Sequence, residues 1–314
     1  MNQATVSAHP NIALVKYWGK QSRGRNIPVS PSVSVTLDTL TTTTTVEQSF
    51  NDLVVIDGLD VKNEKISSWL EFARKKYEIP PICIRSESNF PASSGLASSA
   101  SGFSALAVSV NQACGLGLED QEVAELARIG SASAARSMWS GFVSLNPAGE
   151  SCTVEQVYPK EHWDLRVVVA ITDPRQKGVS STEGMERSVA TSSFHEAWRQ
   201  TTEGDYQECL KALEDRDFSR LSKVAERNCC KMHGLMLTSD PPLIYWKPGT
   251  LAALDSLRIL QEAAVPTFFT IDAGPQVKAF CLPEAADTVE EHLRNTPGVT
   301  QTIRCGVGDG PVVH

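Results

Sequence analysis

Apolar and polar residues alternate along the first third of the chain, which is typical of half-buried β-strands. The alternation is clearest at residues 32–37, 41–46 and 53–56, and Asp57-Gly58 after the third segment is a turn signal. Antiparallel hairpins are the simplest arrangement for strands spaced so closely. The second segment contains a run of threonines, which favour strands because they are β-branched, and we expect it to form an edge strand.

The spacing of apolar residues changes to that of a helix over residues 64–77, and Pro80-Pro81 marks its end. A strand is expected at 82–86. A helix of small residues then extends to about residue 113, and a further helix is expected at 120–129. The first half therefore predicts both helices and strands.

The second half begins with a continuous apolar run at residues 165–172, which has the length and composition of a buried strand. We place a domain boundary just before it, so that the chain divides into residues 1–164 and 165–314. The elements expected after this strand are helices at about 183–200, 203–214 and 217–237, a strand at 267–272, a helix at 284–294 and a strand at 300–307. The whole pattern predicts a mixed protein of helices and antiparallel strands.

The composition is that of a globular protein, with 314 residues, 41% hydrophobic and 21% charged, and a formal net charge of −8. Such an acidic balance disfavours a protein that binds nucleic acid or a membrane through its overall charge. We find neither a signal-like leader nor an apolar segment of membrane-spanning length, so a cytoplasmic location is expected. The cysteines are expected to be reduced, and the histidines lack ligand spacing, so no metal site made by histidines is expected.

Glycine and serine dominate residues 91–102, between a predicted strand and a predicted helix. Free backbone N–H groups at a helix start bind phosphate, and small side chains allow the phosphate to come close. The hydroxyls of Ser93, Ser94, Ser98 and Ser99 would add donors. A tightly packed helix start explains the same residues without a ligand, and neither the P-loop pattern nor the dinucleotide-binding pattern is present.

Residues 130–137 combine a glycine and three serines with Arg136. The planar guanidinium group can bind a carboxylate or a phosphate through two hydrogen bonds, and Ser131 and Ser133 place hydroxyls beside it. The alternative is a surface arginine whose stem packs on a helix. Its polar neighbours favour an anion site.

The apolar segment 11–20 ends with two lysines, Lys16 and Lys20, and with Tyr17. Lysines at the end of a strand suit a polyanionic substrate, and the tyrosine hydroxyl can donate to it. Lys20 can also be an ordinary surface charge. Lys16 lies inside the apolar run, where an ammonium group without a partner would be costly to bury.

Asp272 ends a predicted strand and precedes a Gly-Pro turn. A carboxylate in this place can act as a general base or orient a hydroxyl, but an aspartate before a turn also forms purely local hydrogen bonds. Residues 177–182 add a lysine and a Ser/Thr cluster ahead of a helix. They predict either a second phosphate contact or a helix cap.

The glycine-serine segment Pro-Ala-Ser-Ser-Gly-Leu-Ala-Ser-Ser-Ala, residues 91–100, resembles the phosphate loop of the GHMP kinase superfamily, Pro-x-x-x-Gly-Leu-x-Ser-Ser-Ala. Within that superfamily the chain resembles the diphosphomevalonate decarboxylase family over nearly its whole length. The segments that carry this resemblance are 11–20, 34–37, 130–137, 179–182 and 272–275. It implies an α+β fold of two halves with mixed and antiparallel sheets, an N-terminal ATP-binding domain, and an active site in the cleft between the halves.

The family uses MgATP to phosphorylate the 3-hydroxyl of mevalonate 5-diphosphate and then releases phosphate and CO2 to give isopentenyl diphosphate. The resemblance implies catalytic roles for Asp272 at the 3-hydroxyl, Arg136 at the substrate carboxylate and Lys16 near the reacting hydroxyl. The substrate and its diphosphate would be held by Tyr17, Lys20, Ser131, Ser133, Arg136 and Ser181. The ATP phosphates would be held by Ser93, Ser94, Gly95, Leu96, Ala97, Ser98 and Ser99. ATP and Mg²⁺ are the implied cofactors, and a homodimer is the implied assembly.

One segment departs from the family pattern. Many members have Leu-Pro-x-Asn-Ser-Ser-Ile-Ser-Val-Thr where residues 27–36 are Ile-Pro-Val-Ser-Pro-Ser-Val-Ser-Val-Thr, so Ser30 and Pro31 remove an amide and a backbone N–H. A decarboxylase of mevalonate 5-phosphate and a mevalonate-type kinase without decarboxylation are therefore the alternatives. The presence of Asp272, Arg136 and a complete phosphate loop disfavours a non-catalytic sensor built on the same fold.

Overall fold

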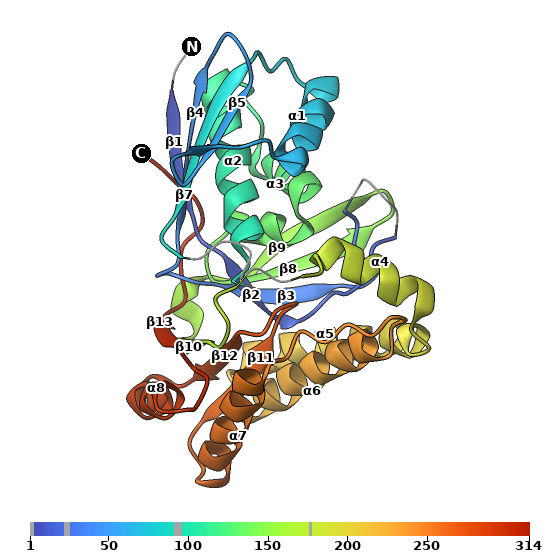
Figure 1. Ribbon diagram of the computed structural model, residues 1–314, viewed down its shortest axis with the longest axis vertical. Coiled ribbons are helices and arrows are strands. Elements are labelled where there is room, and N and C mark those ends of the chain that lie inside the picture. Colours follow the sequence, from blue (N-terminus) through green and yellow to red (C-terminus); the bar gives the residue numbers. More distant parts are fainter. Residues whose placement is uncertain (1–2, 22–25, 91–95, 176–177) are drawn as a thin grey trace.

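The structure is a computed structural model that describes residues 3–21, 26–90, 96–175 and 178–314. Its elements form three layers along the longest axis, which Figure 1 shows from top to bottom. A six-stranded sheet with its helices makes the upper layer, and two four-stranded sheets make the middle and lower layers. The combination of helices with mostly antiparallel sheets confirms an α+β fold.

The upper sheet has the strand order β14-β1-β4-β7-β5-β6. Its strands are β1 (Ala4–Ala8), β4 (Thr42–Gln48), β5 (Leu53–Ile56), β6 (Leu59–Asp60), β7 (Ile82–Ser88) and β14 (Val312–Val313). The helices packed on it are α1 (Glu64–Lys76), α2 (Ser98–Cys114) and α3 (Asp120–Gly130). Burial of Trp69, Ile84 and Phe103 in one apolar cluster joins the helices to the sheet.

The threonine-rich strand β4 lies between β1 and β7, so the expectation of an edge strand is wrong. Its hydroxyls have partners on both faces. The Thr42 hydroxyl lies 2.7 Å from that of Ser101 in α2, and the Thr43 hydroxyl lies 2.8 Å from that of Ser7 in β1. Because each hydroxyl is both donor and acceptor, paired hydroxyls allow a polar strand to occupy an interior position.

The strands of the first third do not form successive hairpins, which corrects a second expectation. β3 (Ser32–Thr36) and β4 belong to different sheets, and β5 pairs with β7 in parallel. The hairpin from β5 to β6 does form at Asp57-Gly58, where both residues have positive φ, 50° and 78°. Hydrophobic alternation shows that a strand exists but carries little information about its partner.

The middle sheet has the order β2-β3-β8-β9, with β2 (Asn11–Val15), β8 (Phe142–Ala148) and β9 (Ser151–Tyr158) around β3. Before β8, the 3₁₀ helix η1 (Ala132–Met138) follows α3 directly. The sequence analysis missed the hairpin of β8 and β9. Its signal is weak because β9 alternates between exposed and buried positions over only half its length.

The lower sheet is antiparallel, with the order β11-β12-β10-β13. Its strands are β10 (Arg166–Ile171), β11 (Thr267–Ile271), β12 (Val277–Cys281) and β13 (Gln301–Cys305). One face joins a core shared with the middle sheet, α5 (His195–Asp215) and α6 (Phe218–Leu237). The other face packs against α7 (Pro248–Glu262) and α8 (Ala286–Arg294), and the short 3₁₀ helices η2 (Lys160–His162) and η3 (Pro283–Ala285) lie in connections.

The helices of the second half differ from the expected ones in two places. The pattern at 183–200 is divided into α4 (Ser181–Thr191) and α5, because the chain turns at Ser192, whose hydroxyl lies 2.6 Å from that of Thr238. The sequence analysis missed α7, where exposed Leu251 and Ile259 blur the apolar face. In the described ranges, no helix combines the length and the apolarity needed to cross a bilayer.

The segment after β13 returns to the upper layers. Gly308 N donates to Thr36 O at 2.7 Å and Gly308 O accepts from Gly141 N at 3.0 Å, so the segment lies against β3 and the start of β8. A Cβ atom on Gly308 would lie 1.9 Å from the carbonyl oxygen of Leu37, which requires glycine there. Beyond it, β14 pairs with β1, so the second half contributes a strand to the first sheet.

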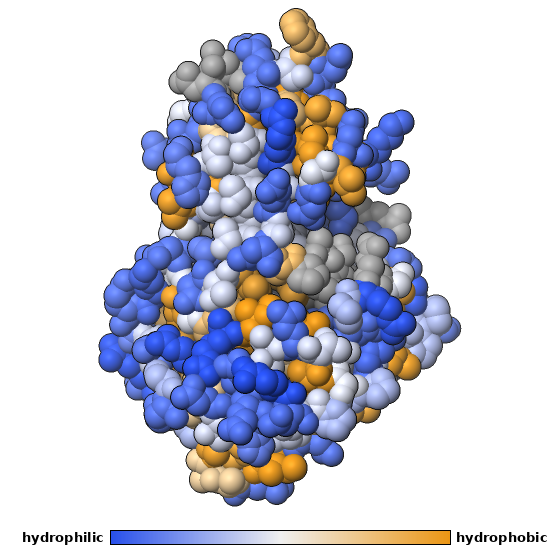
Figure 2. Space-filling model, turned by 60° about the vertical axis from the view of Figure 1, so that its left-hand side comes forward, coloured by the Kyte–Doolittle hydropathy of each residue, from blue (hydrophilic) through white to orange (hydrophobic). Residues whose placement is uncertain are grey.

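One face of the molecule is mainly polar. On the face seen in Figure 2, hydrophilic side chains predominate and apolar side chains occur in small groups between them. All eight cysteines have free thiols, and six of them are buried in the core. The fold therefore depends on apolar packing rather than on disulfides.

Candidate active site

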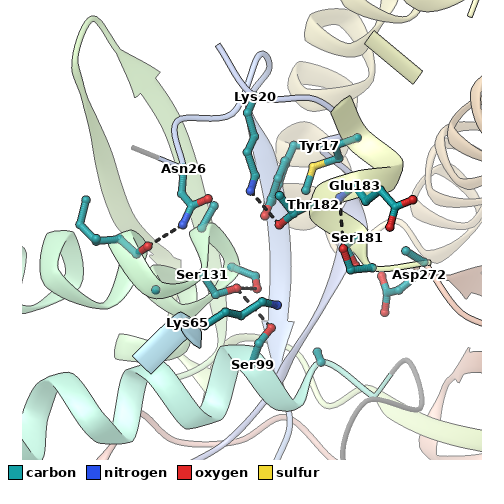
Figure 3. A pocket seen from close by; sticks show the side chains of 18 of the residues that line it. Tyr17, Lys20, Asn26, Lys65, Ser99, Ser131, Ser181, Thr182, Glu183 and Asp272 are labelled. Carbon is teal, nitrogen blue, oxygen red and sulfur yellow. Dashed lines mark hydrogen bonds between the residues drawn. The ribbon is translucent and has the colours of Figure 1, made fainter. Parts of the chain in front are cut away.

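A cavity of about 1020 Å³ lies between the upper layer and the start of α4. Several chain segments end at it: the segment after β2, the first turns of α2 and α4, η1 and the turn after β11. The sequence-predicted residues that line it are Lys16, Tyr17, Lys20, Ala97, Ser98, Ser99, Ser131, Ser133, Arg136, Ser181 and Asp272. Figure 3 shows Ser99 and Ser131 together, with Ser181 and Asp272 across the cavity from them.

One of the predicted site residues lies away from the cavity, and others are not described. Leu96 is buried in the core shared by the middle and lower layers and does not line the cavity. Ser93, Ser94 and Gly95 lie outside the described residues, as does Lys177.

Asp272 follows β11 directly and stands at the edge of the cavity. The Nζ atom of Lys16 donates to its Oδ1 at 2.5 Å, and the Nζ atom of Lys278 lies 3.1 Å from its Oδ2. Burial alone would raise the pKa of Asp272, but Lys16 and then Lys278 outweigh burial and hold that pKa below its ordinary value. The carboxyl group is therefore ionised at neutral pH.

The position of Lys16 is fixed through its backbone. Its N–H donates to Asn228 Oδ1 at 2.7 Å, and Asn228 Nδ2 donates to Asp205 Oδ2 at 3.0 Å. Asp205 is buried and also pairs with Arg227 and Lys231, each at 2.9 Å. Because this network comes from α5 and α6, it ties the end of β2 to the helices below it.

Arg136 is 3% exposed and lines the cavity from η1. Its Nε donates to Ser34 Oγ at 2.9 Å, its Nη1 donates to Ser32 Oγ at 2.6 Å, and its Nη2 donates to Asn11 Oδ1 at 3.0 Å. In the described part of the chain every hydrogen-bond partner of Arg136 is uncharged. A buried guanidinium with no carboxylate partner favours an anion from outside the chain.

Hydroxyl groups connect the first turn of α2 to η1. Ser99 Oγ lies 3.2 Å from Ser131 Oγ, which lies 3.1 Å from Ser133 Oγ. At the start of α2, Ala97 has a φ of 58° and the first turn has no acidic residue. Within the described residues no side chain caps this 17-residue helix, and the start of a helix is a place that favours an anion.

The start of α4 confirms one of the two expectations for the Ser/Thr cluster, the helix cap. Ser180 Oγ accepts from Glu183 N at 3.2 Å, which confirms a helix cap. Ser181 and Thr182 line the cavity, and the Nζ atom of Lys20 donates to Thr182 Oγ1 at 3.0 Å (Figure 3).

Sequence reasoning missed several residues of the site. Lys278 is fully buried within an apolar strand. A lysine inside an apolar run is the same sequence signal that marks Lys16. Asn11 and Asn228 left no signal, because the site groups that they contact, Arg136 and the backbone of Lys16, are more than 100 positions away. The departing residue Ser30 is buried and does not line the cavity, and its hydroxyl has no hydrogen-bond partner among the described residues. It lies two positions before Ser32, which holds Arg136.

The fold and this cavity define the chain as a member of the GHMP kinase fold class. The structure of mevalonate diphosphate decarboxylase from Staphylococcus aureus matches it with a TM-score of 0.92 at 32% identity, over 99% of this chain and 98% of that one. A chain described as MDDEF in complex with MVAPP, AMPPCP and magnesium matches with a TM-score of 0.92 at 34% identity, over the same shares of 99% and 98%.

Sequence comparison specifies the family. The diphosphomevalonate decarboxylase of Candida albicans is 30% identical over 99% of this chain and 98% of its own length. Residues 8–154 match the model of the diphosphomevalonate decarboxylase-like N-terminal domain. Residues 167–309 match that of the mevalonate 5-diphosphate decarboxylase C-terminal domain. The chain belongs to the diphosphomevalonate decarboxylase family.

Proposed function

We propose that the chain converts mevalonate 5-diphosphate and ATP into isopentenyl diphosphate, ADP, phosphate and CO2, with Asp272, Lys16 and Arg136 at the reacting centre. The observation that carries these assignments is that one cavity holds an ionised carboxylate, Asp272, and a buried guanidinium, Arg136, whose described partners are all neutral. The substrate has a hydroxyl that can bind Asp272 and a carboxylate that can bind Arg136. Membership of the family supports the choice of substrate.

The reaction has two steps. The γ-phosphoryl group of ATP is transferred to the oxygen of the 3-hydroxyl, which loses its proton. The C–C bond to the carboxylate then breaks, its electron pair forms the double bond, and phosphate leaves from C3. Phosphorylation is needed because phosphate leaves far more readily than hydroxide.

Asp272 accepts a hydrogen bond from the 3-hydroxyl and orients its oxygen toward ATP. Since the pKa of Asp272 is lowered, the carboxylate is a weak base. Transfer of a phosphoryl group is largely dissociative, so that placing the oxygen matters more than removing its proton early. Lys16, next to Asp272 in the cavity, stabilises negative charge on the transferred group.

Arg136 binds the substrate carboxylate through its planar group. Ser32, Ser34 and Asn11 hold the guanidinium in place without neutralising it, because none of them is charged. The carboxylate is therefore fixed relative to C3 while the leaving group forms.

The diphosphate of the substrate is bound by one cation and several hydroxyls. The residues we assign to it are Tyr17, Lys20, Ser131, Ser133 and Ser181. They combine one ammonium group with neutral donors, a set that suits a polyanion.

ATP and Mg²⁺ are the cofactors, and the start of α2 fits the nucleotide phosphates. The small side chains of this turn, the absence of an acidic residue in it and the hydroxyls of Ser98 and Ser99 all favour an anion there. We assign the same role to Ser93, Ser94 and Gly95 and the backbone of Leu96. Ser98 and Ser99 would help to hold Mg²⁺ at the nucleotide, where it would supply positive charge to the phosphates.

The experiment that tests this function supplies MgATP with mevalonate 5-diphosphate, mevalonate 5-phosphate or mevalonate, and follows ADP, phosphate and CO2 together. We expect equal amounts of the three products with the diphosphate alone. Equal products with only the monophosphate would refute the substrate and implicate the segment around Ser30 and Pro31. ADP without CO2 would refute decarboxylation.

Lys20 gives a prediction for the pH dependence of substrate binding. Burial lowers the pKa of Lys20 to about 8, with Glu186 opposing and Lys65 adding to this effect. The ammonium form binds the diphosphate and is lost as the pH rises through that value. We therefore expect KM for the substrate to increase by up to about tenfold per pH unit above pH 8.

The Lys20→Met variant should have a high KM that does not change over this pH range. Lys62→Met is the matched control, because it removes an exposed lysine that does not line the cavity. A wild-type KM that stays constant from pH 7 to pH 9.5 would contradict the role of Lys20.

Three further assignments rest on the family rather than on contacts. We propose a cytoplasmic location and a homodimer. We also retain the division at residue 164, which is supported by the family-domain matches that end at residue 154 and begin at residue 167.

A further inference from the structure

Asp272 has two cations, and they occupy different places. Lys16 lines the cavity and contacts Oδ1, whereas Lys278 is absent from the cavity lining, is fully buried on β12 and lies beside Oδ2. In the sheet, Lys278 is paired with Thr270, two residues before Asp272 on β11. One cation is therefore open to a ligand, and the other lies behind the carboxylate.

Apart from Lys16 and Lys278, the positively charged group near Asp272 in the described chain is Arg136, which is not paired with that carboxylate. The titratable and charged groups near it are Lys16 from the end of β2, Lys278 from β12, Cys229 and His233 from α6, and Tyr17 and Arg136 from the cavity lining. Burial raises the pKa of Cys229 to about 12 and lowers that of His233 to about 3, so both are neutral at physiological pH. Burial also raises the pKa of Tyr17, and Arg136 makes no ion pair with the carboxylate in the described chain.

Lys16, the lysine that lines the cavity, contacts Oδ1 of Asp272. On the proposed function, on which this inference rests, a substrate hydroxyl must reach Asp272 and a transferred phosphoryl group attracts Lys16. Were Lys16 the sole partner, its movement toward the substrate would leave a carboxylate without a cation in a largely buried place. Such a carboxylate takes up a proton and no longer accepts a hydrogen bond from the hydroxyl.

We propose that Lys278 is the permanent counter-ion of Asp272, a positioning residue that keeps this carboxylate ionised and fixed while Lys16 moves to the substrate. Lys278 holds Oδ2 from outside the cavity, so substrate binding does not disturb it. Asp272 then presents Oδ1 to the hydroxyl. Lys278 balances the charge of Asp272, and Lys16 assists phosphoryl transfer.

The Lys278→Met variant tests this division, because methionine keeps an unbranched apolar side chain and removes the charge. We expect kcat to fall by about tenfold to a hundredfold, with KM for substrate and ATP changed less than about threefold. Loss of a nearby cation raises the pKa of a carboxylate by about one unit or more. The acidic limb of the kcat profile should therefore move to higher pH by that amount, because activity is lost when Asp272 is protonated.

Lys278→Arg is the matched control, since it keeps the charge, and it should return the acidic limb toward its wild-type position. If Lys278→Met lowers kcat but leaves the acidic limb of the pH profile in place, Lys278 serves packing only and the proposal is overturned. An unchanged kcat in that variant would also overturn it. Inactive wild-type enzyme with the diphosphate would instead refute the proposed function.

A measurement on the wild-type protein covers the case in which the methionine variant does not fold. Lysine side-chain ¹⁵N resonances, assigned with Lys16→Arg and Lys278→Arg, are followed while mevalonate 5-diphosphate and a non-hydrolysable ATP analogue are added. We expect the Lys16 resonance to move and the Lys278 resonance to stay. Equal movement of both would overturn the distinction between a permanent and an exchangeable cation.

Discussion

Replacing Asp272 by asparagine is expected to lower kcat by roughly 10³-fold, the scale of a positioned acid-base group. The amide keeps the size of the carboxylate but cannot accept from the 3-hydroxyl with the same strength or hold Lys16 and Lys278 as an ion pair. ATP binding should remain within about threefold of wild type, because the first turn of α2 is a separate part of the cavity. The measurements are single-turnover phosphoryl transfer and equilibrium binding of an ATP analogue.

Asp173→Asn is the matched control for this variant. Asp173 follows β10, pairs with Arg175 at 2.7 Å and does not line the cavity, so its loss should leave turnover nearly unchanged. Melting temperatures of both variants separate chemistry from folding, since Asp272→Asn leaves two lysines without their anion. Near wild-type turnover in a folded Asp272→Asn variant would contradict the assignment of this residue.

Arg136→Lys is expected to reduce kcat/KM by about 10²- to 10³-fold, although the charge is kept. One ammonium group cannot bond Ser32, Ser34 and Asn11 and also bind a carboxylate through two parallel hydrogen bonds. The sharper expectation concerns the ratio of products. If the carboxylate is held loosely, phosphorylation outpaces decarboxylation, and ADP exceeds CO2 during the first turnovers.

Arg128→Lys is the control for the cost of replacing a buried arginine. Arg128 is 1% exposed, pairs with Glu125 and does not line the cavity. We expect that variant to lose some thermal stability and to keep equal yields of ADP and CO2. Equal yields and an unchanged KM in Arg136→Lys would count against carboxylate binding at that residue.

Much of the site was predictable because its residues mark the ends of elements. Lys16 closes an apolar strand, Asp272 precedes a turn, and Ser98 opens a helix, so each has a local sequence signal. Their assembly in one cavity follows from the fold. The supporting residues were not predictable in this way. In the sequence Asn228 is an ordinary polar residue of a helix, and its contact with the backbone of Lys16 is formed only in the folded protein.

The fold shows the same limit. Helical spacing located α1, α3 and α6 well, because each buries one apolar face. Strand order was beyond the sequence, as β4 illustrates, since pairing depends on neighbours distant along the chain. The confirmed family resemblance supplied what periodicity lacked, namely the α+β fold and the reaction.

The pairing of β14 with β1 has a consequence for how the protein is made. Ser7 and His314, whose side chains lie 2.8 Å apart, are separated by 307 positions, so the outer edge of β1 stays unpaired until residues that far along the chain have been synthesised. An unpaired strand edge is a template for association with other chains. β14 is only two residues long, so it covers the edge of β1 and exposes a short edge itself. The risk of aggregation is therefore greater for nascent chains than for folded molecules.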